Sequence, residues 1–428
     1  MPDPSSSNQG SIVVRNARLL TFPGAPGSPL RGEGLGEPEI VERADVLISG
    51  DRIAKVSSRK SGAVIRKPEP APAGATEIDA DGRVLMPGFV DCHTHACWAG
   101  SRLDEWDQKR RGVPYLTILK NGGGIMATVR AVRDCPFNDL VDLLVKRANR
   151  VLALGSTTIE VKSGYGLNTE TELKMLRAVR AAQARFAGTL VPTALLGHAI
   201  DESQPGFVGR VVRETLPAVA SEFGGAGIAV DAYVEKGAWS VEQAMLLFAR
   251  ARDLGMPLRV HADQFNPLGM VPAAVRMGFR SVDHLEASTR EDLDALAGAS
   301  ATFGVMLPAC GFHLKGAYAR GRHFVENGGL LALATNYNPG SAPCPSMAFV
   351  IALAVRHLGL SPHEALAAAT VNPAALLGLS DRGRVAAGQR ADLLLLREAD
   401  ERSVAFGFGD SPVETVIAGG RVVGPATG

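Results

Sequence analysis

The stretch Phe89–Gly100, "FVDCHTHACWAG", ends an apolar run with two histidines, His93 and His95, separated by one residue. In a β-strand, the side chains at positions i and i+2 point to the same face of the sheet. The two imidazoles are therefore predicted to project side by side from one strand end. Such a pair is either two polar residues at a strand terminus or half of a metal site. Which of the two applies depends on whether the rest of the chain supplies further ligands.

The middle of the chain alternates short apolar runs with helix-like segments. Continuous apolar strands that alternate with helices are typical of parallel βα units. Eight such runs predict a closed (β/α)₈ barrel, with an open doubly wound sheet as the alternative. The runs are residues 84–95, 156–164, 189–198, 227–235, 257–263, 281–285, 302–308 and 330–336.

Both ends of the chain differ from this middle, because they read as short strands broken by Gly and Asp turn signals. Two β-rich ends therefore flank the predicted barrel. Residues 23–38, near the N-terminal end, are rich in Pro and Gly. Their composition predicts an exposed, mobile loop.

Nearly every predicted barrel strand ends in a residue that is capable of chemistry, and only the seventh, which ends near Pro308, lacks one. In a barrel the carboxyl ends of all strands meet at one face, where such folds place their active sites. Residues far apart in the sequence are thus predicted to converge. In chain order they are His93 and His95, Lys162 with Tyr165 just beyond, His198, Glu235, His261, His284 and Asn336.

Three of these residues suit a metal ion. Imidazole nitrogen is a ligand for zinc, iron and nickel, and a catalytic zinc commonly has three protein ligands and an open position. His93, His95 and His261 would supply three nitrogens, with Asn336 placed where a fourth ligand would be useful. Such an ion lowers the pKa of its bound water towards about 7. The pattern indicates hydrolysis of a C–N bond at a carbonyl or amidine-like carbon.

The composition limits the classes of partner that this protein is expected to bind. The 428 residues are 46% hydrophobic and 21% charged, with a formal net charge of +1 and no basic block or acidic tail. Nothing favours nucleic acid or an anionic membrane, so a small-molecule substrate is the expected partner. The five cysteines are scattered and odd in number, which predicts free thiols and a cytoplasmic location. Neither a signal-peptide pattern nor a membrane-spanning apolar run is found.

Several motifs carry a resemblance to a known family. "PGFVDCHTH" resembles the signature of the amidohydrolase superfamily, and the chain is most similar to its imidazolonepropionase family. The stretches "EVKSGYGL", "HADQ", "SVDHLE" and "NYNPGS" carry this closer resemblance, in order along the barrel. It implies a barrel over residues 86–383 and a composite β-sandwich domain built from residues 10–85 and 384–428.

The resemblance also implies an activity, which is the hydrolytic opening of 4-imidazolone-5-propanoate to N-formimidoyl-L-glutamate in histidine degradation. The enzyme would be a cytoplasmic homodimer with one Zn²⁺ or Fe³⁺ ion per subunit. Position by position, the implied metal ligands are His93, His95, His261 and Asn336. The implied catalytic residues are His284, Gln264 and Asn336, and the implied substrate contacts are Arg102, Tyr165, His198, Gln264, Asn338, Gly340 and Ser341. The guanidinium fork of Arg102 suits the propionate carboxylate.

Two positions depart from the family pattern: Gln264 replaces a Glu, and Asn336 replaces the Asp that ligates the metal and accepts a proton. An amide is uncharged and does not accept a proton at neutral pH. Three interpretations follow: another base acts, with His284 or Asp263 as candidates; the enzyme is weakened; or a metal-binding relative has lost catalysis. The first is favoured because the other site residues are kept. A different cyclic-amide hydrolase or a deaminase is the alternative function, and it would not need Arg102.

Overall fold

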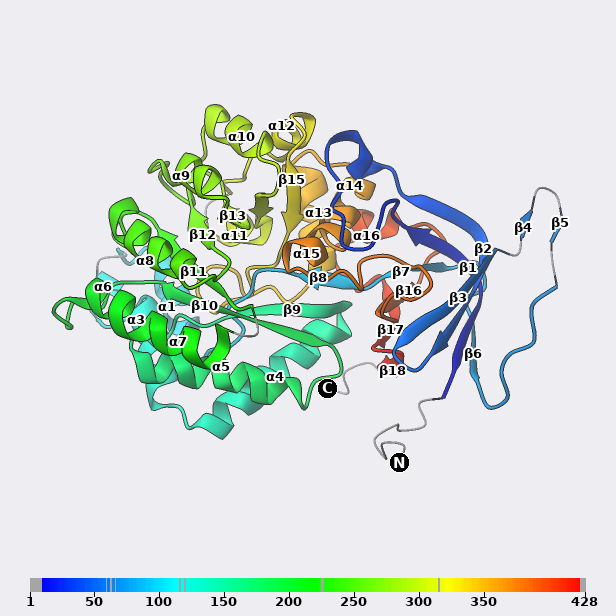
Figure 1. The fold of residues 1–428 in the computed structure, drawn as a ribbon, viewed down its shortest axis with the longest axis horizontal. Helices are drawn as coiled ribbons and strands as arrows, with labels where there is room; N and C mark the ends of the chain where they lie inside the picture. Colours follow the sequence, from blue (N-terminus) through cyan, green and yellow to red (C-terminus); the bar gives the residue numbers. More distant parts are fainter. Residues whose placement is uncertain are drawn as a thin grey trace.

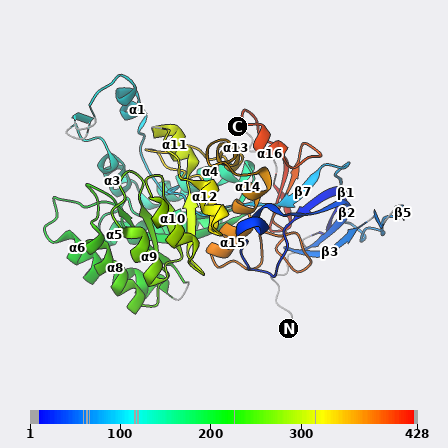
Figure 2. The ribbon, with the colours of Figure 1, turned by 90° about the horizontal axis from the view of Figure 1, so that it is seen from above.

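The computed structural model describes residues 10–58, 60–61, 64–65, 67–114, 117–118, 121–224, 227–314 and 316–423. An α/β barrel is joined to a β-rich unit, which lies to its right in both views (Figure 1 and Figure 2). The β-rich unit contains strands from both ends of the chain. The prediction of a (β/α)₈ fold with a second unit from both chain ends is therefore confirmed.

The barrel contains eight parallel strands, which follow one another in the sheet in the order of the sequence. Beyond the named strands, Thr94 pairs with Tyr337, and the Asn336 amide donates to the His93 carbonyl at 3.0 Å. These contacts join the first strand to the eighth, so the barrel is nearly closed and the open sheet is excluded. The strands are β8 (Phe89–Asp91), β9 (Ser156–Lys162), β10 (Thr189–Gly197), β11 (Ala229–Val234), β12 (Arg259–Ala262), β13 (Ser281–His284), β14 (Phe303–Met306) and β15 (Leu330–Leu333).

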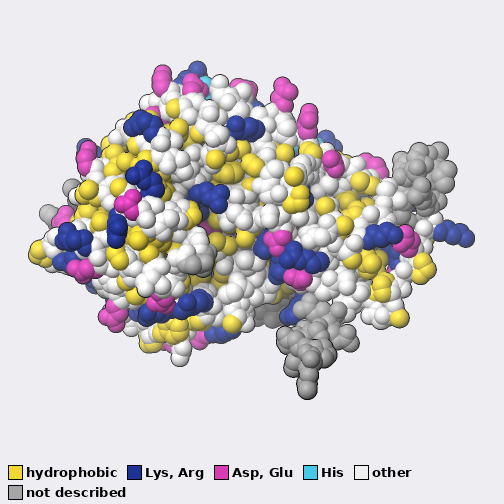
Figure 3. Space-filling model, viewed as in Figure 1, with side chains coloured by type: hydrophobic (Ala, Val, Ile, Leu, Met, Phe, Trp, Pro, Cys, Tyr) yellow, Lys and Arg dark blue, Asp and Glu magenta, His cyan; other side chains and the backbone are white. Residues whose placement is uncertain are grey.

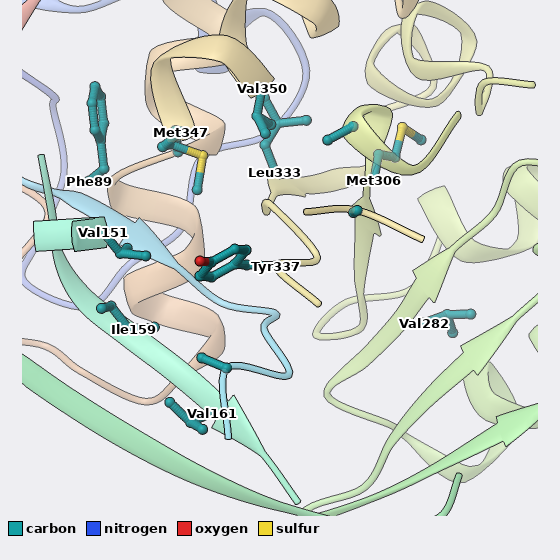
Figure 4. Packing of buried hydrophobic residues seen from close by; sticks show 14 of the residues in the cluster. Phe89, Val151, Ile159, Val161, Val282, Met306, Leu333, Tyr337, Met347 and Val350 are labelled. Atoms are coloured by element: carbon teal, nitrogen blue, oxygen red, sulfur yellow. The ribbon is translucent and has the colours of Figure 1, made fainter. Parts of the chain in front are cut away.

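Amphipathic helices cover the barrel. The longest, α4, buries the face that carries Leu140, Leu144, Val151 and their neighbours, which recur at helical spacing. Met347 and Val350 of α13 pack in the same cluster as Leu333 of β15 (Figure 4). The helices of this unit are α1 (Leu103–Arg110), α3 (Ile125–Asp134), α4 (Phe137–Ala153), α5 (Thr169–Gln183), α6 (Phe207–Arg210), α7 (Leu216–Phe223), α8 (Val241–Asp253), α9 (Met270–Met277), α10 (Arg290–Ala297), α11 (Pro308–Leu314), α12 (Gly321–Glu326), α13 (Met347–His357), α14 (Pro362–Ala368) and α15 (Val371–Leu376), with a π-helical turn over Val211–Thr215.

The second unit is one mixed sheet with the order β18-β17-β16-β7-β1-β2-β3, and β6 pairs with β1. Apolar side chains from its two halves, such as Val14, Val46, Leu393 and Ile417, form one cluster. The second unit therefore has a hydrophobic core of its own. Its strands are β1 (Ile12–Thr21), β2 (Glu39–Ser49), β3 (Arg52–Ser58), β6 (Thr76–Asp79), β7 (Val84–Pro87), β16 (Leu393–Leu396), β17 (Val413–Ala418) and β18 (Arg421–Val423). In addition, β4 (Lys60–Ser61) pairs separately with β5 (Val64–Ile65), and α16 spans Ser403–Phe406.

We propose a division of the chain into two domains. Residues 10–85 and 384–428 form the β-rich domain, and residues 86–383 form the barrel. Strand β7 continues two residues past the first boundary.

One predicted strand, residues 84–95, is two strands in the structure. β7 belongs to the mixed sheet, whereas β8 begins the barrel. Gly88 separates these two strands. A Cβ atom at this position would lie 2.3 Å from Oγ1 of Thr157, so the packing leaves room for glycine alone. The close backbone approach at this glycine permits the chain to leave one sheet and enter the other.

The Pro/Gly-rich stretch 23–38 is only partly exposed, and distant residues anchor it. Arg384 donates hydrogen bonds to the Phe22, Pro23 and Ser28 carbonyls, at 3.2, 2.9 and 2.7 Å. Leu35, in a 3₁₀ helix over Gly32–Gly36, is fully buried. The prediction of an exposed loop is thus wrong for this part, because its anchors lie more than 300 residues away and local composition does not reveal them.

The surface carries charges of both signs, which are interspersed on the face seen in Figure 3. All five cysteines are free, as predicted. Among the described helices, none combines the length and apolar character that a membrane span requires.

Candidate active site

A cavity of about 570 Å³ opens at the carboxyl ends of the barrel strands. All but one of the residues that the family resemblance implies as metal ligands, catalytic residues or substrate contacts line it, which places residues from most of the chain around one space. They are His95, Arg102, Tyr165, His198, His261, Gln264, His284, Asn336, Asn338, Gly340 and Ser341. Lys162 and Glu235, which end two other predicted strands, are not among the lining residues.

His93, the exception, lies fully buried beneath the cavity, with its ring centroid 4.4 Å from that of His261. Its Nδ1 lies 2.6 Å from Oδ2 of Asp283, so Nδ1 carries the proton that this carboxylate accepts. Its Nε2 is buried and has no hydrogen-bond partner. Buried polar atoms are almost always satisfied, so this orphaned nitrogen marks a place where a ligand is expected.

His261 is held in the same way, because its Nδ1 lies 3.0 Å from Oδ1 of Asp231. Its Nε2 lies 3.4 Å from Nε2 of His95. Two nitrogen ligands of a tetrahedral zinc ion, each about 2.0–2.1 Å from the metal, are separated by about 3.3–3.4 Å. The spacing of these two nitrogens thus fits a shared metal ion.

A third histidine completes a compact group of nitrogens. Among the described residues, ring nitrogens of His93, His261 and His284 all lie within 4.8 Å of one another. The group includes His284, which the sequence analysis assigned as a catalytic residue. The predicted ligand His95 is not in this group, but it contacts one member of it, His261. Imidazole nitrogen, which these residues share, is a donor that suits zinc or iron.

The predicted ligands are uncharged in this setting. Burial, followed by neighbouring positive charges such as Lys162 and the other imidazoles, lowers the pKa of His93, His95 and His261 well below its usual value. Neutral imidazole is the form that coordinates a metal, because protonation removes the lone pair.

His284 differs from its neighbours. Burial alone would lower its pKa, but the Glu286 carboxylate and Cys310 raise it to about 10. Nδ1 of His284 lies 3.2 Å from both oxygens of Glu286. His284 also has a φ of 89°, and Leu285 after it a φ of 72°. Such strained backbone at a strand end is typical of functional sites.

A buried layer of charged side chains underlies the histidines. Lys162 Nζ lies 2.7 Å from Oε1 of Glu160 and 2.8 Å from Oδ2 of Asp231. Arg259 donates to Oε1 of Glu160 at 3.1 Å and to Oδ2 of Asp283 at 2.7 Å. Burial alone would raise the pKa of Asp283, but Arg259 and Lys162 hold it below its usual value. The layer therefore supplies an ionised acceptor to Nδ1 of His93, whereas burial raises the pKa of Asp231, the partner of His261.

Arg102, which also lines the cavity, is partly buried and fixed by its neighbours. Its Nε and Nη2 donate to the two oxygens of Glu105, each at 2.6 Å, and its Nη1 lies 3.3 Å from Oγ1 of Thr128. The ring of His198, another lining residue, stacks on that of His95 at a centroid distance of 5.0 Å. The ring of Tyr165 lies 5.1 Å from that of His198.

The loop after the eighth strand holds Asn336. Asn338 Nδ2 donates to Oδ1 of Asn336 at 3.1 Å, which leaves one lone pair on that oxygen. Oδ1 of Asn338 accepts the amide protons of Gly340 and Ser341 at 2.8 and 2.7 Å. Asn336 has a φ of 54°, a conformation that asparagine tolerates better than most residues.

Several site residues escaped the sequence analysis. Lys109 and Tyr233 line the cavity, and Tyr233 donates to Oε1 of Gln264 at 2.9 Å. The seventh strand is followed by Cys310, whose Sγ accepts from Nε2 of Gln264 at 3.2 Å. A thiol after an apolar run reads as a core residue, so only the position of Cys310 after a barrel strand could have indicated it. Asp263, the other candidate base, is not among the residues that line the cavity.

Comparison with known proteins places these observations in a family. The model of the amidohydrolase family matches residues 76–114 and 118–423. The imidazolonepropionase of Rubrobacter xylanophilus is 42% identical, covering 97% of this chain and 99% of that protein, and the imidazolonepropionase of Deinococcus radiodurans is 44% identical, covering 93% and 96%. The crystal structure of 5-methylcytosine deaminase from Klebsiella pneumoniae with phosphonocytosine matches with a TM-score of 0.71 at 18% identity, covering 96% of this chain and 98% of that one. At that identity the structural match concerns the fold alone.

Proposed function

Because the chain belongs to the amidohydrolase family and, within it, groups with the imidazolonepropionases, we propose that it opens the ring of 4-imidazolone-5-propanoate to give N-formimidoyl-L-glutamate. It is a hydrolase that acts on a C–N bond of a cyclic amide. The observation that carries this function is the cavity itself, where a group of imidazole nitrogens and the Arg102 guanidinium face one space.

The imidazole end suits a metal ion. His93, His95 and His261 would hold it, with Asn336 as a weak fourth ligand through its amide oxygen. The orphaned Nε2 of His93 and the spacing of the other two nitrogens support this assignment. When bound, such an ion activates water and polarises a carbonyl oxygen. The side chains present suit either zinc or iron, and we propose one ion per subunit.

The rest of the cavity orients the substrate. Arg102 would bind the propionate carboxylate, and Tyr165 and His198 would contact the ring. Gln264 is fixed by Tyr233 and Cys310, so its amide presents a defined edge to a ring NH or carbonyl. Asn338, Gly340 and Ser341 would contact the part of the substrate near the eighth strand. A substrate that is held in this orientation reacts as in a unimolecular step, which lowers the entropic part of the activation free energy.

In the reaction, water adds to the ring carbonyl carbon and the bond from that carbon to the ring nitrogen breaks. The added water brings two protons: one goes to the nitrogen that leaves, and the other is released as the new carboxyl group ionises to a carboxylate. We propose that His284 gives the leaving nitrogen its proton, because it lines the cavity and Glu286 fixes its Nδ1. Asn336 cannot accept a proton, and Asp263, the other candidate base, lies outside the cavity lining. His284 is protonated at neutral pH because its pKa is raised, so it acts as a base only after it has given its proton to the leaving nitrogen.

The test is a turnover assay on the metal-loaded protein with imidazolonepropionate. Loss of the ring and formation of N-formimidoyl-glutamate, followed by mass spectrometry, would support the proposal. Stoichiometric metal without ring opening would indicate a metal-binding relative that has lost catalysis. Ring opening of a neutral cyclic amide in preference to the propionate would indicate a different hydrolase of the superfamily.

We also propose that the protein works as a homodimer in the cytoplasm. The free cysteines suit a reducing compartment. Light scattering coupled to gel filtration measures the oligomeric state, and a monomer at micromolar concentration would contradict the dimer.

A further inference from the structure

The carboxylate-binding end of the cavity is not a lone arginine. The Nε/Nη2 edge of Arg102, which could clamp a carboxylate through two parallel bonds, is already taken by Glu105. The exposed fraction of the Glu105 side chain is 8%, and the Gly124 amide donates to it at 2.8 Å, so this partner is fixed. A substrate carboxylate can therefore reach only the remaining N–H groups of Arg102.

A second cation lies beside this arginine. Nζ of Lys109 and Nη2 of Arg102 contact the same Oε1 atom of Glu105, each at 2.6 Å. Lys109 lines the same cavity as Arg102. Two cations share one carboxylate, so these three side chains together carry a net charge of +1. An anionic ligand placed against both cations would neutralise it.

Gly340 borders the guanidinium of Arg102. A Cβ atom at Gly340 would sit 3.4 Å from Nη1 of Arg102, so a larger side chain there would crowd the guanidinium. Gly340 and Ser341 both line the cavity, and with Arg102 and Lys109 they form a polar niche in its wall.

We propose that Lys109 is a specificity-determining residue that binds the substrate carboxylate together with Arg102. Glu105 holds the two cations side by side, so that the niche selects ligands with an anionic tail over neutral ones. This inference rests on the proposed function for the identity of the tail, a propionate. A Glu–Lys pair four residues apart on a helix otherwise has only a stabilising role, and that role predicts no ligand selectivity.

The test compares the binding of two ligands to the metal-loaded protein by calorimetry: 3-(imidazol-4-yl)propanoate and the corresponding neutral propanamide. The wild-type protein should prefer the propanoate. Lys109→Met should reduce this preference about tenfold, the lower end for one hydrogen bond to a charged group. Lys109→Arg should keep most of it. Arg110→Met is the matched control, because Arg110 lies on the same helix and does not line this cavity.

Turnover separates this inference from the proposed function. In Lys109→Met, KM for imidazolonepropionate should rise about tenfold with little change in kcat, since the tail is bound alike before and during the reaction. Equal binding of the two ligands by the wild-type protein, or an unchanged preference in Lys109→Met, would overturn the role of Lys109. Lys109-dependent selectivity without ring opening would instead overturn the proposed function and leave this inference standing.

Discussion

At the scale of single residues, the proposed function depends most on position 336. Asn336 lies in the loop after the eighth strand, where the family resemblance implies an aspartate, and its Oδ1 accepts a hydrogen bond from Asn338. The amide keeps the shape of the carboxylate but loses its charge and its capacity to take a proton. The surrounding site residues still line one cavity, so this change affects the chemistry more than the architecture.

We expect Asn336→Asp to raise kcat, by up to about 10² if the carboxylate restores a proton acceptor next to the attacking water. Steady-state kinetics with imidazolonepropionate, with the metal content of both proteins measured, provide the check. Asn338→Asp is a useful comparison, because it places a carboxylate two residues away. A kcat that does not rise in Asn336→Asp would mean that another group already takes the proton of the attacking water.

Asp283 shows how a residue without substrate contact can control the site. Its carboxylate accepts from Nδ1 of His93, which leaves the lone pair of Nε2 for a metal. We expect Asp283→Asn to weaken metal binding about 10- to 100-fold, as is usual for the outer partners of metal-bound histidines. Competition with a chelator of known affinity measures this effect.

The control for this variant is Asp392→Asn, which removes another buried carboxylate with arginine partners in the mixed sheet. It should lower thermal stability and leave metal affinity unchanged. Equal metal affinity in Asp283→Asn and wild type would show that Asp283 serves only the buried charge layer.

At the scale of elements, the strand ends carry the function. The three clustered histidines lie at or near the carboxyl ends of barrel strands: His93 follows β8, His261 is the last residue but one of β12, and His284 ends β13. Regular apolar strands end where the chain turns outward, and several of these turns adopt a positive φ, as at Asp263 and His284. The elements therefore provide rigidity, and the residues just beyond them provide chemistry.

Gly88 tests the junction between the two sheets. We expect Gly88→Ala to lower stability by about 1–3 kcal/mol, because the new Cβ would collide with Thr157 in a packed interior. Thermal unfolding followed by circular dichroism measures it. Gly34→Ala is the matched control, since a Cβ at Gly34 meets nothing within 4 Å. A wild-type melting temperature for Gly88→Ala would show that the junction adjusts at little cost.

At the scale of the whole molecule, the site exists only when the barrel closes. Its nitrogens come from the first, fifth and sixth strands, and the contact between Asn336 and His93 joins the last strand to the first. A ligand that binds only the folded state stabilises it by mass action. Metal binding and barrel closure should thus be coupled.

Metal removal tests this coupling. We expect one zinc or iron ion per chain by elemental analysis, and we expect chelation to abolish turnover and to lower the melting temperature by several degrees. Adding the ion back should restore both. A protein that melts at the same temperature with and without the ion would contradict a site that spans the barrel.

The sequence by itself determined the eight apolar runs, their alternation with helices, and the polar residues at their ends, because these are local patterns of period and composition. It also indicated which side chains share the cavity, once a barrel was assumed. Only the tertiary structure decided the break at Gly88, the anchoring of residues 23–38 by Arg384, the carboxylates under His93 and His261, and the contact of Lys109 and Arg102 with the same oxygen of Glu105. The physical reason is that these features depend on contacts between segments distant in sequence, or on the direction in which a side chain points, and neither leaves a local signal.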